Sequence, residues 1–283
     1  MIIDGKKFAQ KLRNKIKKEI QSIKNKTQLT PGLTVILVGN HTPSEIYVRN
    51  KELSAKEVGI SSKVLRFKSS ISETKLISVI HKLNRDKKVH GILVQLPLPN
   101  HISGHKIIEE IDPKKDVDGF HAINVGNLSS GKDALVPCTP LGCYLMIKSV
   151  RKNLAGLNAL IIGRSNLNGK PMAQLLLKED CTVTIGHSKT KNLKELCKKA
   201  DIVVAAVGRA NLVKGDWVKK GAIVIDVGIN RVEKKKGYKI VGDVEFKSVV
   251  KKAKAITPVP GGVGPVTIAC LLNNTLKAFK NIN

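Results

Sequence analysis

The sequence predicts an α/β protein of two domains, each built on a parallel sheet. Apolar strand-like runs alternate with segments of helical periodicity along the 283 residues, and this order is typical of parallel sheets. Residues 136–142, VPCTPLG, interrupt the alternation near the middle of the chain and are the expected linker. A strand–turn–helix pattern with glycines follows at residues 160–176, as in dinucleotide-binding domains. We therefore expect a Rossmann-like second domain.

The first domain is expected to contain three strands and three helices before a loop. Short apolar runs predict the strands, and apolar residues at helical spacing predict the helices. Ser72 is the expected N-cap of the third helix, and Gly59 ends the second. The expected helices cover residues 1–24, 44–59 and 72–84, the strands 33–39, 63–67 and 91–99, and the loop 112–121.

Four further strands define the second domain. They are the apolar runs at residues 159–165, 181–188, 201–208 and 221–228. Residues 257–265 are too rich in proline and glycine for a regular element, and a helix follows and packs back on the first domain. We therefore assign residues 1–137 and the C-terminal helix 266–283 to the first domain, and residues 138–265 to the second.

The formal net charge of +28 raises the question of nucleic-acid binding. Only eight of the 50 basic residues are arginine, the lysines are spread along the chain, and aromatic residues make up 3%. Phosphate and base recognition favours arginine forks and aromatic platforms. The charge is therefore interpreted as compositional bias, and a basic nucleic-acid-binding protein stays open as the non-enzymatic alternative.

The sequence is typical of a cytoplasmic protein without a membrane partner. No apolar run approaches the roughly 20 residues that span a bilayer, and the N-terminus alternates charged and apolar residues instead of forming a signal peptide. The cysteines, with no metal-binding spacing among them, are expected to be reduced packing residues. A nucleophilic role for Cys138 is disfavoured because no histidine partner is visible. The five cysteines are Cys138, Cys143, Cys181, Cys197 and Cys270.

The stretch LIIGRSNLNGKP, residues 160–171, predicts an anion site. An apolar run ends in Gly163, a polar turn follows, and Gly169 precedes a helix-like run. Backbone N–H groups and the helix dipole collect phosphates at such a turn. The second glycine of the usual G-x-G-x-x-G is missing, and Arg164 follows the first.

The next strand predicts NADP rather than NAD as the cofactor. NAD-specific folds carry an acidic residue about 20 positions on, which holds the ribose hydroxyls. Here that strand ends in Gly186, His187, Ser188 and Lys189, without a carboxylate. A cation and hydroxyl groups suit a 2′-phosphate, and Arg164 can donate charge-assisted hydrogen bonds to it.

Four residues are candidates for the chemistry. Tyr47 and Lys51 lie four apart on an expected helix and share a face. The spacing also occurs in short-chain dehydrogenases, but there the glycine motif comes first in the chain. Gln95 is a polar amide within an apolar strand and needs a partner. Asp118 lies in a loop after such strands, where α/β sites gather.

Many ordered motifs together resemble one enzyme family. They are YVRNK, GILVQLPLP, DPKKDVDGFHAINVGNL, PCTP, GRSNLNGKP, VTIGHSKT, ADIVVAAVG, GDWVKKGAIVIDVGIN, GDV and TPVPGGVGPVT. The chain resembles, nearly end to end, the bifunctional methylenetetrahydrofolate dehydrogenase/methenyltetrahydrofolate cyclohydrolase (FolD-type) family. The resemblance implies tetrahydrofolate derivatives as substrates, NADP as cofactor, no metal, a homodimer and an active-site cleft between the domains. It also implies a supply of one-carbon units for purine, methionine and histidine biosynthesis.

The resemblance assigns roles residue by residue. Lys51 matches the central catalytic lysine, Tyr47 the tyrosine that packs on folate, Gln95 the glutamine that bonds the lysine, and Asp118 the aspartate that anchors the pterin. The matching cofactor contacts are Gly163, Arg164, Ser165, Ser188 and Ile229, and the loop over the folate contains Pro258, Gly261 and Gly262. Three positions depart from the family pattern: Asn168, Gly186 and Val266 stand where valine, cysteine and methionine are usual.

The chemistry has two steps with different needs. Loss of hydride from the one-carbon bridge to the nicotinamide needs orientation of two rings and no proton removal. Addition of water and ring opening to 10-formyltetrahydrofolate need proton transfer, for which Lys51 is the candidate. Gln95 can orient the lysine without adding charge, and Asp118 can accept hydrogen bonds from the pterin. A dehydrogenase-only member of the family and an amino- or hydroxy-acid dehydrogenase are the enzymatic alternatives.

Overall fold

The computed structural model describes residues 1–233 and 237–283, which form two compact units. Unit 1 contains Met1–Ala9 and Thr139–Thr267, and unit 2 contains Gln10–Cys138 and Ile268–Asn283. This division differs from the predicted domains at the N-terminus, where the first nine residues belong with the later part of the chain. The reason is a backbone pairing, because Ile3 N donates to Ile256 O at 2.8 Å.

Unit 2 is built on a three-stranded parallel sheet of order β2-β1-β3. Helices α1 and α10 each begin in unit 1 and continue into unit 2. The elements are α1 (Gly5–Thr27), β1 (Gly32–Val38), α2 (Thr42–Val58), β2 (Ser61–Phe67), α3 (Glu73–Arg85), β3 (Gly91–Val94), α4 (Gly104–Glu109), α5 (Ala122–Ser129) and α10 (Val263–Ile282).

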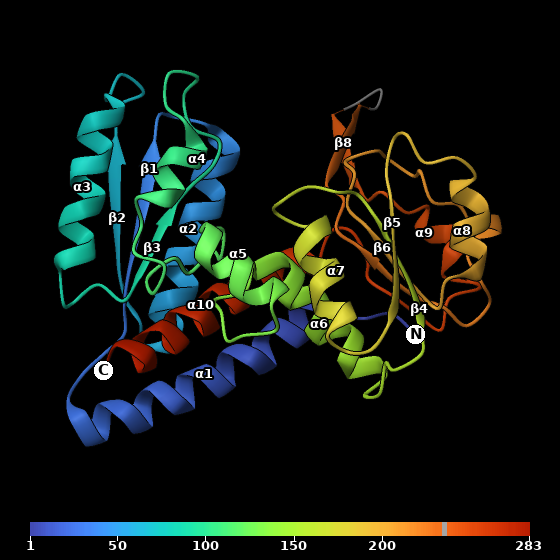
Figure 1. Cartoon of the computed structure of the whole chain (residues 1–283), viewed down its shortest axis with the longest axis horizontal. Helices are drawn as coiled ribbons and strands as arrows, with labels where there is room; N and C mark the ends of the chain where they lie inside the picture. Colours follow the sequence, from blue (N-terminus) through green and yellow to red (C-terminus); the bar gives the residue numbers. More distant parts are fainter. Residues whose placement is uncertain (234–236) are drawn as a thin grey trace. The chain divides into compact units, whose positions relative to one another are not determined.

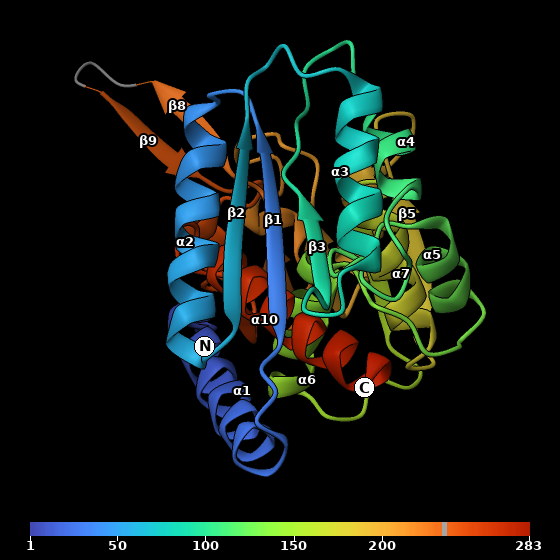
Figure 2. The same cartoon turned by 90° about the vertical axis from the view of Figure 1, so that its left-hand side faces the viewer.

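Helices cover both faces of this sheet, and all of β1 is therefore buried. Figure 1 shows α3 on one side of the strands and α2 on the other, and Figure 2 shows the three strands side by side. Leu76 and Ile80 of α3 pack against Ile36 of β1 and Ile92 of β3. Ile36 pairs with Val94, two residues after Ile92, so the side chains of Ile36 and Ile92 point to the same face of the sheet. The apolar stripe of α3 thus decides which face it covers.

Unit 1 carries a five-stranded parallel sheet of order β10-β7-β6-β4-β5. The chain passes from β4 to β5 on one side and returns to β6 on the other, so the strand order reverses beside β4. Its elements are α6 (Cys138–Val150), β4 (Asn158–Ile162), α7 (Gly169–Leu177), β5 (Thr182–Gly186), α8 (Leu193–Lys199), β6 (Ile202–Ala205), the 3₁₀ turn η1 (Gly215–Trp217), β7 (Ile223–Asp226), β8 (Asn230–Glu233), β9 (Tyr238–Val241), α9 (Phe246–Val249) and β10 (Ala255–Ile256).

The core of unit 1 lies between its sheet and its helices. Figure 1 shows α7 on one side of the strands and α8 and α9 on the other. Cys197 of α8 and Val249 of α9 are fully buried against the apolar side chains of β4, β6 and β7. The two-sided cover explains why these strands are continuous apolar runs rather than alternating ones.

Several predicted bounds differ from the structure, and α10 begins at Val263, inside the segment 257–265 that was expected to be irregular. The strand expected over 91–99 ends at Val94, although the backbone N–H of Gln95 still donates to Ile36 O at 2.9 Å. The linker expected over 136–142 is wrong from Cys138 onward, where α6 begins. Pro140 lies in the first turn of that helix, where the backbone N–H groups have no partner within the helix and proline is tolerated.

Several short elements had no predicted counterpart: α4, α5, β8, β9 and β10. The two helices have at most eight residues, too few for a helical period to stand out, and the three strands lack a continuous apolar run of four residues. Within residues 1–233 and 237–283, no helix combines the length and apolar character that crossing a bilayer requires.

Candidate active site

A buried lysine and a glutamine form the centre of the site in unit 2. Lys51 of α2 is 9% exposed, and its Nζ donates to Gln95 Oε1 at 2.9 Å. Gln95 Nε2 donates to Leu96 O at 2.8 Å, so the amide oxygen is turned toward the lysine. Gln95 directly follows β3 at its carboxyl end. The glutamine therefore holds the amine in place without adding a charge.

Tyr47 lies one helical turn before Lys51 on α2, and its side chain is 40% exposed. Val48 beside it is fully buried, so this part of α2 turns Val48 inward and leaves the tyrosine ring accessible. An accessible aromatic ring next to a buried amine can stack on a planar ligand.

The Asp118 carboxyl is the third member of the cluster. Burial raises its pKa, while the charge of Lys51 and a contact from the Cys138 thiol, 3.9 Å from Oδ1, lower it. The charge of Lys51 is thus close enough to act on this carboxyl. Lys51, Gln95 and Asp118 come together in unit 2 from three separate segments of the chain.

Cys138 is a buried neighbour of Asp118 and not an activated thiol. Its Sγ lies 3.3 Å from Val117 O. Burial first, and then the charge of Asp118, raise its pKa well above the ordinary value. A thiol must be ionised to attack. The structure therefore supports the sequence-based rejection of a nucleophilic role.

Asn274 of α10 supports the Asp118 segment and was missed by the sequence reasoning. Its Nδ2 donates to Val117 O at 2.9 Å and to Val136 O at 2.8 Å, and the residue is 1% exposed. One amide thus joins the chain next to Asp118 to the segment before Cys138. The available signal was a polar residue at a buried position of an apolar helix.

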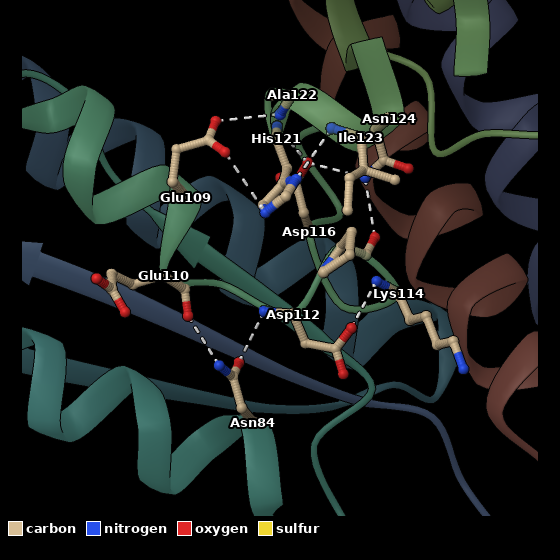
Figure 3. A network of polar contacts seen from close by, with 11 residues as sticks. Asn84, Glu109, Glu110, Asp112, Lys114, Asp116, His121, Ala122, Ile123 and Asn124 are labelled. Atoms are coloured by element: carbon tan, nitrogen blue, oxygen red, sulfur yellow. Dashed lines mark hydrogen bonds and ion pairs between the residues drawn. The ribbon is translucent and has the colours of Figure 1, made fainter. Parts of the chain in front are cut away.

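A buried carboxylate, Asp116, shapes the loop that contains Asp118, and Figure 3 shows Asp116 beside His121 and Asn124. Asp116 is 1% exposed and accepts hydrogen bonds from Gly119 N at 3.1 Å, His121 N at 2.8 Å and Asn124 Nδ2 at 3.0 Å. Gly119 has φ +74°, a conformation that favours glycine. The three donors bend the chain back around the carboxylate, and Asp118 lies inside this bend.

His121 ties the same loop to α4, as Figure 3 shows. Its Nδ1 accepts from Ile123 N at 3.1 Å at the start of α5. The proton of the neutral ring is therefore on Nε2, which faces Glu109 Oε2 at 3.7 Å. Glu109 Oε1 accepts from Ala122 N at 3.1 Å. The loop that carries Asp118 is thus anchored at both ends.

In unit 1, the predicted anion loop follows β4, where the strand order reverses. Gly163 has φ +128°, and a Cβ there would lie 2.4 Å from Ala206 O, which follows β6. A Cβ on Gly169 would lie 2.1 Å from Gly163 O. Both glycines are required by close backbone approaches. Ligands of open α/β sheets bind at the carboxyl ends of strands at such a switch point.

The side chains of this loop are available to a ligand. Arg164 and Ser165 are exposed, and Ser165 Oγ accepts from Asn168 N at 3.1 Å. Asn168 is the N-cap of α7 but makes no side-chain cap hydrogen bond. The first N–H groups of α7 and an exposed guanidinium thus lie at one end of β4, and this arrangement suits an anion.

The turn after β5 contains Ser188, which is exposed. His187 N donates to Thr190 Oγ1 at 2.9 Å, and Lys189 N donates to His187 Nδ1 at 3.2 Å. A Cβ on Gly186 would lie 2.6 Å from Leu193 Cδ1. The cysteine usual in the resembled family would therefore require Leu193 to move.

The remaining predicted residues also lie in unit 1. Ile229, after β7, is 57% exposed, which is unusual for an isoleucine between ordered strands. In the loop over 258–262, a Cβ on Gly262 would lie 2.4 Å from Pro258 O, and a Cβ on Gly5 would lie 1.7 Å from Gly262 O. Gly261 has φ +96°. The loop is therefore a tightly stacked backbone that bulky residues would disrupt.

The candidate residues thus fall into two sets. The catalytic candidates belong to unit 2 and the nucleotide and loop candidates to unit 1; the cleft expected between the domains stays a prediction. In the part of the chain that the structure describes, no three histidine, cysteine or acidic side chains are grouped as metal ligands.

Comparisons with known proteins cover nearly the whole chain. The family "Tetrahydrofolate dehydrogenase/cyclohydrolase, catalytic domain" matches residues 3–118, and the "NAD(P)-binding domain" of the same family matches residues 137–283. The "Bifunctional protein FolD" of Pelagibacter ubique (strain HTCC1062) is 62% identical over 280 residues, which are 99% of this chain and 98% of that protein.

Two solved structures are similar over the full length. The bifunctional FolD methylenetetrahydrofolate dehydrogenase/cyclohydrolase of Campylobacter jejuni has a TM-score of 0.96 and 48% identity, covering 99% of both chains. The FolD of Trypanosoma brucei, complexed with NADP cofactor and inhibitor, has a TM-score of 0.95 and 37% identity, covering 99% of this chain and 97% of that one.

The buried Asp116 gives a prediction for pH dependence. Burial is the largest cause that raises its pKa from 3.8 to about 6, and the hydrogen bonds from His121 and Asn124 offset part of it. The folded chain holds this proton more tightly than the unfolded chain. The contribution of the protonated Asp116 to the stability of the folded chain is therefore full below pH 3.8, and it is lost as the pH rises through about 6.

Between pH 5 and 7.5, we expect this group to lower the free energy of unfolding by about 1 kcal/mol. The Asp116→Asn variant lacks the titration, so its unfolding free energy should fall less than that of the wild type over this range in urea denaturation. Carbon-13 NMR of the carboxyl measures the pKa directly. A midpoint near 4 would contradict the prediction.

Proposed function

The chain belongs to the tetrahydrofolate dehydrogenase/cyclohydrolase family, and on that premise we propose which of its residues carry each step of the reaction. It is a bifunctional enzyme of folate one-carbon metabolism. It oxidises 5,10-methylenetetrahydrofolate to 5,10-methenyltetrahydrofolate with NADP, and it hydrolyses the product to 10-formyltetrahydrofolate.

The hydrogen bond of 2.9 Å between Lys51 Nζ and Gln95 Oε1 carries the assignment of the catalytic centre. A buried amine whose charge acts on a neighbouring carboxyl is a candidate proton-transfer group. Tyr47 adds an accessible ring one turn away on the same helix.

In the oxidation, the residues of unit 2 orient the folate. Asp118 accepts hydrogen bonds from the N–H groups of the pterin, and Tyr47 packs on the ring system. Bound NADP supplies the hydride acceptor. The methenyl product is a delocalised cation that has lost no proton, so orientation is the main contribution of these side chains.

In the hydrolysis, a water molecule adds to the methenyl carbon and a ring carbon–nitrogen bond breaks. The oxygen of the water loses both protons as it becomes the formyl carbonyl. One proton is released to solvent and the other goes to the leaving nitrogen, so a single group can transfer the second proton from oxygen to nitrogen. We assign this transfer to Lys51. Gln95 keeps the amine directed at the reacting carbon through its carbonyl oxygen.

The loops of unit 1 suit NADP. The close approaches at Gly163 and the start of α7 suit a pyrophosphate, with Ser165 beside them. We assign the 2′-phosphate to Arg164 and Ser188, since the end of β5 carries no carboxylate that would repel it. Ile229 offers an exposed apolar contact to the nucleotide.

The loop of Pro258, Gly261 and Gly262 is assigned to folate closure. Its glycines leave the backbone without side chains that would obstruct a flat ligand.

A homodimer is proposed through the edge of the sheet in unit 1. β5 is the last strand of its sheet, and Thr182, Thr184 and Ile185 on it are exposed. Leu177, at the end of the preceding helix, is 58% exposed. An open edge strand pairs readily with a second copy across a twofold axis, and the exposed Ile185 and Leu177 add apolar surface to it.

We further propose a cytoplasmic enzyme whose product supplies purine, methionine and histidine biosynthesis. No specific nucleic-acid partner and no membrane partner are proposed, because the basic residues are dispersed lysines rather than a cluster with aromatic platforms.

Turnover with the two nicotinamide cofactors tests the function first. With methylenetetrahydrofolate and NADP, we expect NADPH to form while the methenyl absorbance stays low, and we expect much slower turnover with NAD. Persistent methenyl would indicate a dehydrogenase-only enzyme. Turnover with NAD alone would contradict the phosphate site at Arg164 and Ser188.

Substitution of Lys51 tests the proton-transfer assignment. In Lys51→Ala and Lys51→Gln, hydrolysis of methenyltetrahydrofolate should fall by about 100-fold or more, because the proposed proton-transfer group is removed. Lys56→Gln, an exposed lysine of the same helix, is the matched control and should keep full activity. Wild-type hydrolysis in both Lys51 variants would remove the assignment.

Substitution of Ile185 tests the dimer. Ile185→Asp adds a charge to the exposed edge of β5, so we expect a monomer in light scattering coupled to gel filtration. Leu53→Asp, an exposed leucine on α2, is the control and should remain dimeric. A dimeric Ile185→Asp variant would refute this interface.

A further inference from the structure

Two buried aspartates lie beneath the loops at the carboxyl ends of β6 and β7 in unit 1. Asp226 is the last residue of β7 and is 3% exposed, and Asp243 is fully buried. Neither is paired with a lysine or arginine among the described ion pairs. Buried carboxylates are costly unless hydrogen-bond donors surround them, so their partners are informative.

Asp243 binds the loop that follows β6. Its carboxylate accepts from three successive backbone N–H groups, those of Val207 at 2.6 Å, Gly208 at 3.0 Å and Arg209 at 2.9 Å. The amide of Asn230 adds a fourth bond at 2.9 Å, from the start of β8. Successive backbone N–H groups of this kind normally bind an external anion. Here the carboxylate of Asp243 already occupies these N–H groups, so they cannot bind the pyrophosphate of a nucleotide. The loop before α7 remains as the pyrophosphate site.

Asp226 binds the segments on either side of the β8–β9 hairpin. It accepts from Gly228 N at 3.0 Å, Asp243 N at 2.8 Å and Val244 N at 3.0 Å. Its own backbone N–H donates to Thr257 Oγ1 at 2.8 Å, next to the loop that begins at residue 258. One carboxylate therefore holds the other in place.

Two glycines make this double contact possible. A Cβ on Gly228 would lie 2.2 Å from Asp243 Oδ1, and a Cβ on Gly242 would lie 1.8 Å from Asp226 Oδ2. Burial, and more weakly the neighbouring Asp243, raise the pKa of Asp226 to about 6. Both carboxylates therefore lie directly against the backbone of a glycine, where no larger residue fits.

The segments held in this way adjoin the proposed nucleotide site. Ala206, which begins the loop bound by Asp243, is the residue whose carbonyl Gly163 approaches. Ile229 lies between Gly228, bound by Asp226, and Asn230, bound by Asp243. The two aspartates therefore determine the position of the exposed Ile229 side chain and of the β6 loop.

We propose that Asp226 and Asp243 form a carboxylate clamp, a pair of positioning residues that shapes the NADP site and serves the dehydrogenase reaction alone. The inference rests on the proposed assignment of NADP to the loops of unit 1. The clamp touches the cofactor only through the backbone segments that it holds. Hydrolysis of methenyltetrahydrofolate consumes no NADP, and its proton transfer is assigned to Lys51 and Gln95 of unit 2. The bond to Thr257, beside the folate loop, comes from the backbone N–H of Asp226, which a side-chain substitution keeps. Hydrolysis should therefore be independent of the two carboxylates.

The test compares both activities in Asp243→Asn and Asp226→Asn. An amide keeps the shape but turns an NH₂ group toward backbone N–H donors, so we expect the KM for NADP to rise about tenfold or more. Hydrolysis of added methenyltetrahydrofolate should stay within about twofold of wild type, which also reports a folded enzyme. Asp216→Asn, an exposed aspartate of the same unit, is the control and should change neither activity.

A milder variant covers the case in which the aspartate variants do not fold. Asn230→Ala removes one donor to Asp243 and should raise the dissociation constant of NADP, measured by calorimetry, by a few fold. Calorimetry tests the clamp even if wild-type turnover fails, and such a failure would count only against the proposed function. Unchanged NADP affinity in the variants, or equal loss of both activities, would overturn the clamp.

Discussion

Buried aspartates that accept hydrogen bonds from backbone N–H groups hold the loops that carry or adjoin the candidate site residues of this protein. A loop beyond the end of a parallel strand has lost its ladder partners, and a buried N–H without an acceptor is costly. Asp116 supplies the acceptor in unit 2, beside Asp118. Asp226 and Asp243 supply it in unit 1. Because a carboxylate accepts several bonds at once, one side chain can determine the course of a whole loop.

The two sets of candidate residues are positioned by different kinds of contact. In unit 2, a neutral amide holds a lysine, so the amine of Lys51 is placed without a fixed counter-charge from Gln95. In unit 1, the requirement is instead close backbone approach, which Gly163 and Gly169 permit at the switch point of the sheet. A reaction that needs proton transfer and a reaction that needs ring orientation can therefore depend on different residues of one chain.

Local patterns predicted the long elements and several site candidates. The apolar period of α3 and its Ser72 cap are present as expected, with Lys75 N donating to Ser72 Oγ at 3.2 Å. Gln95 was recognisable as a polar residue in an apolar run. Asn274 and Asp243 were not recognised, because their partners lie 157 and 36 residues away in the chain. The helix α6 was hidden by two prolines, since tolerance of proline in a first turn depends on where the helix begins.

Local sequence patterns were sufficient to predict the alternation of strands and helices, the glycine turn at Gly163 and the candidate pair Tyr47 and Lys51. These are properties of neighbouring residues, for which period, spacing and turn chemistry are sufficient. The three-dimensional fold was needed to show that the first nine residues join unit 1 and which buried carboxylates bind which backbone N–H groups. Such contacts depend on how the strands are ordered and how deeply each group is buried, because an unpaired buried polar group is costly wherever its partner lies in the chain.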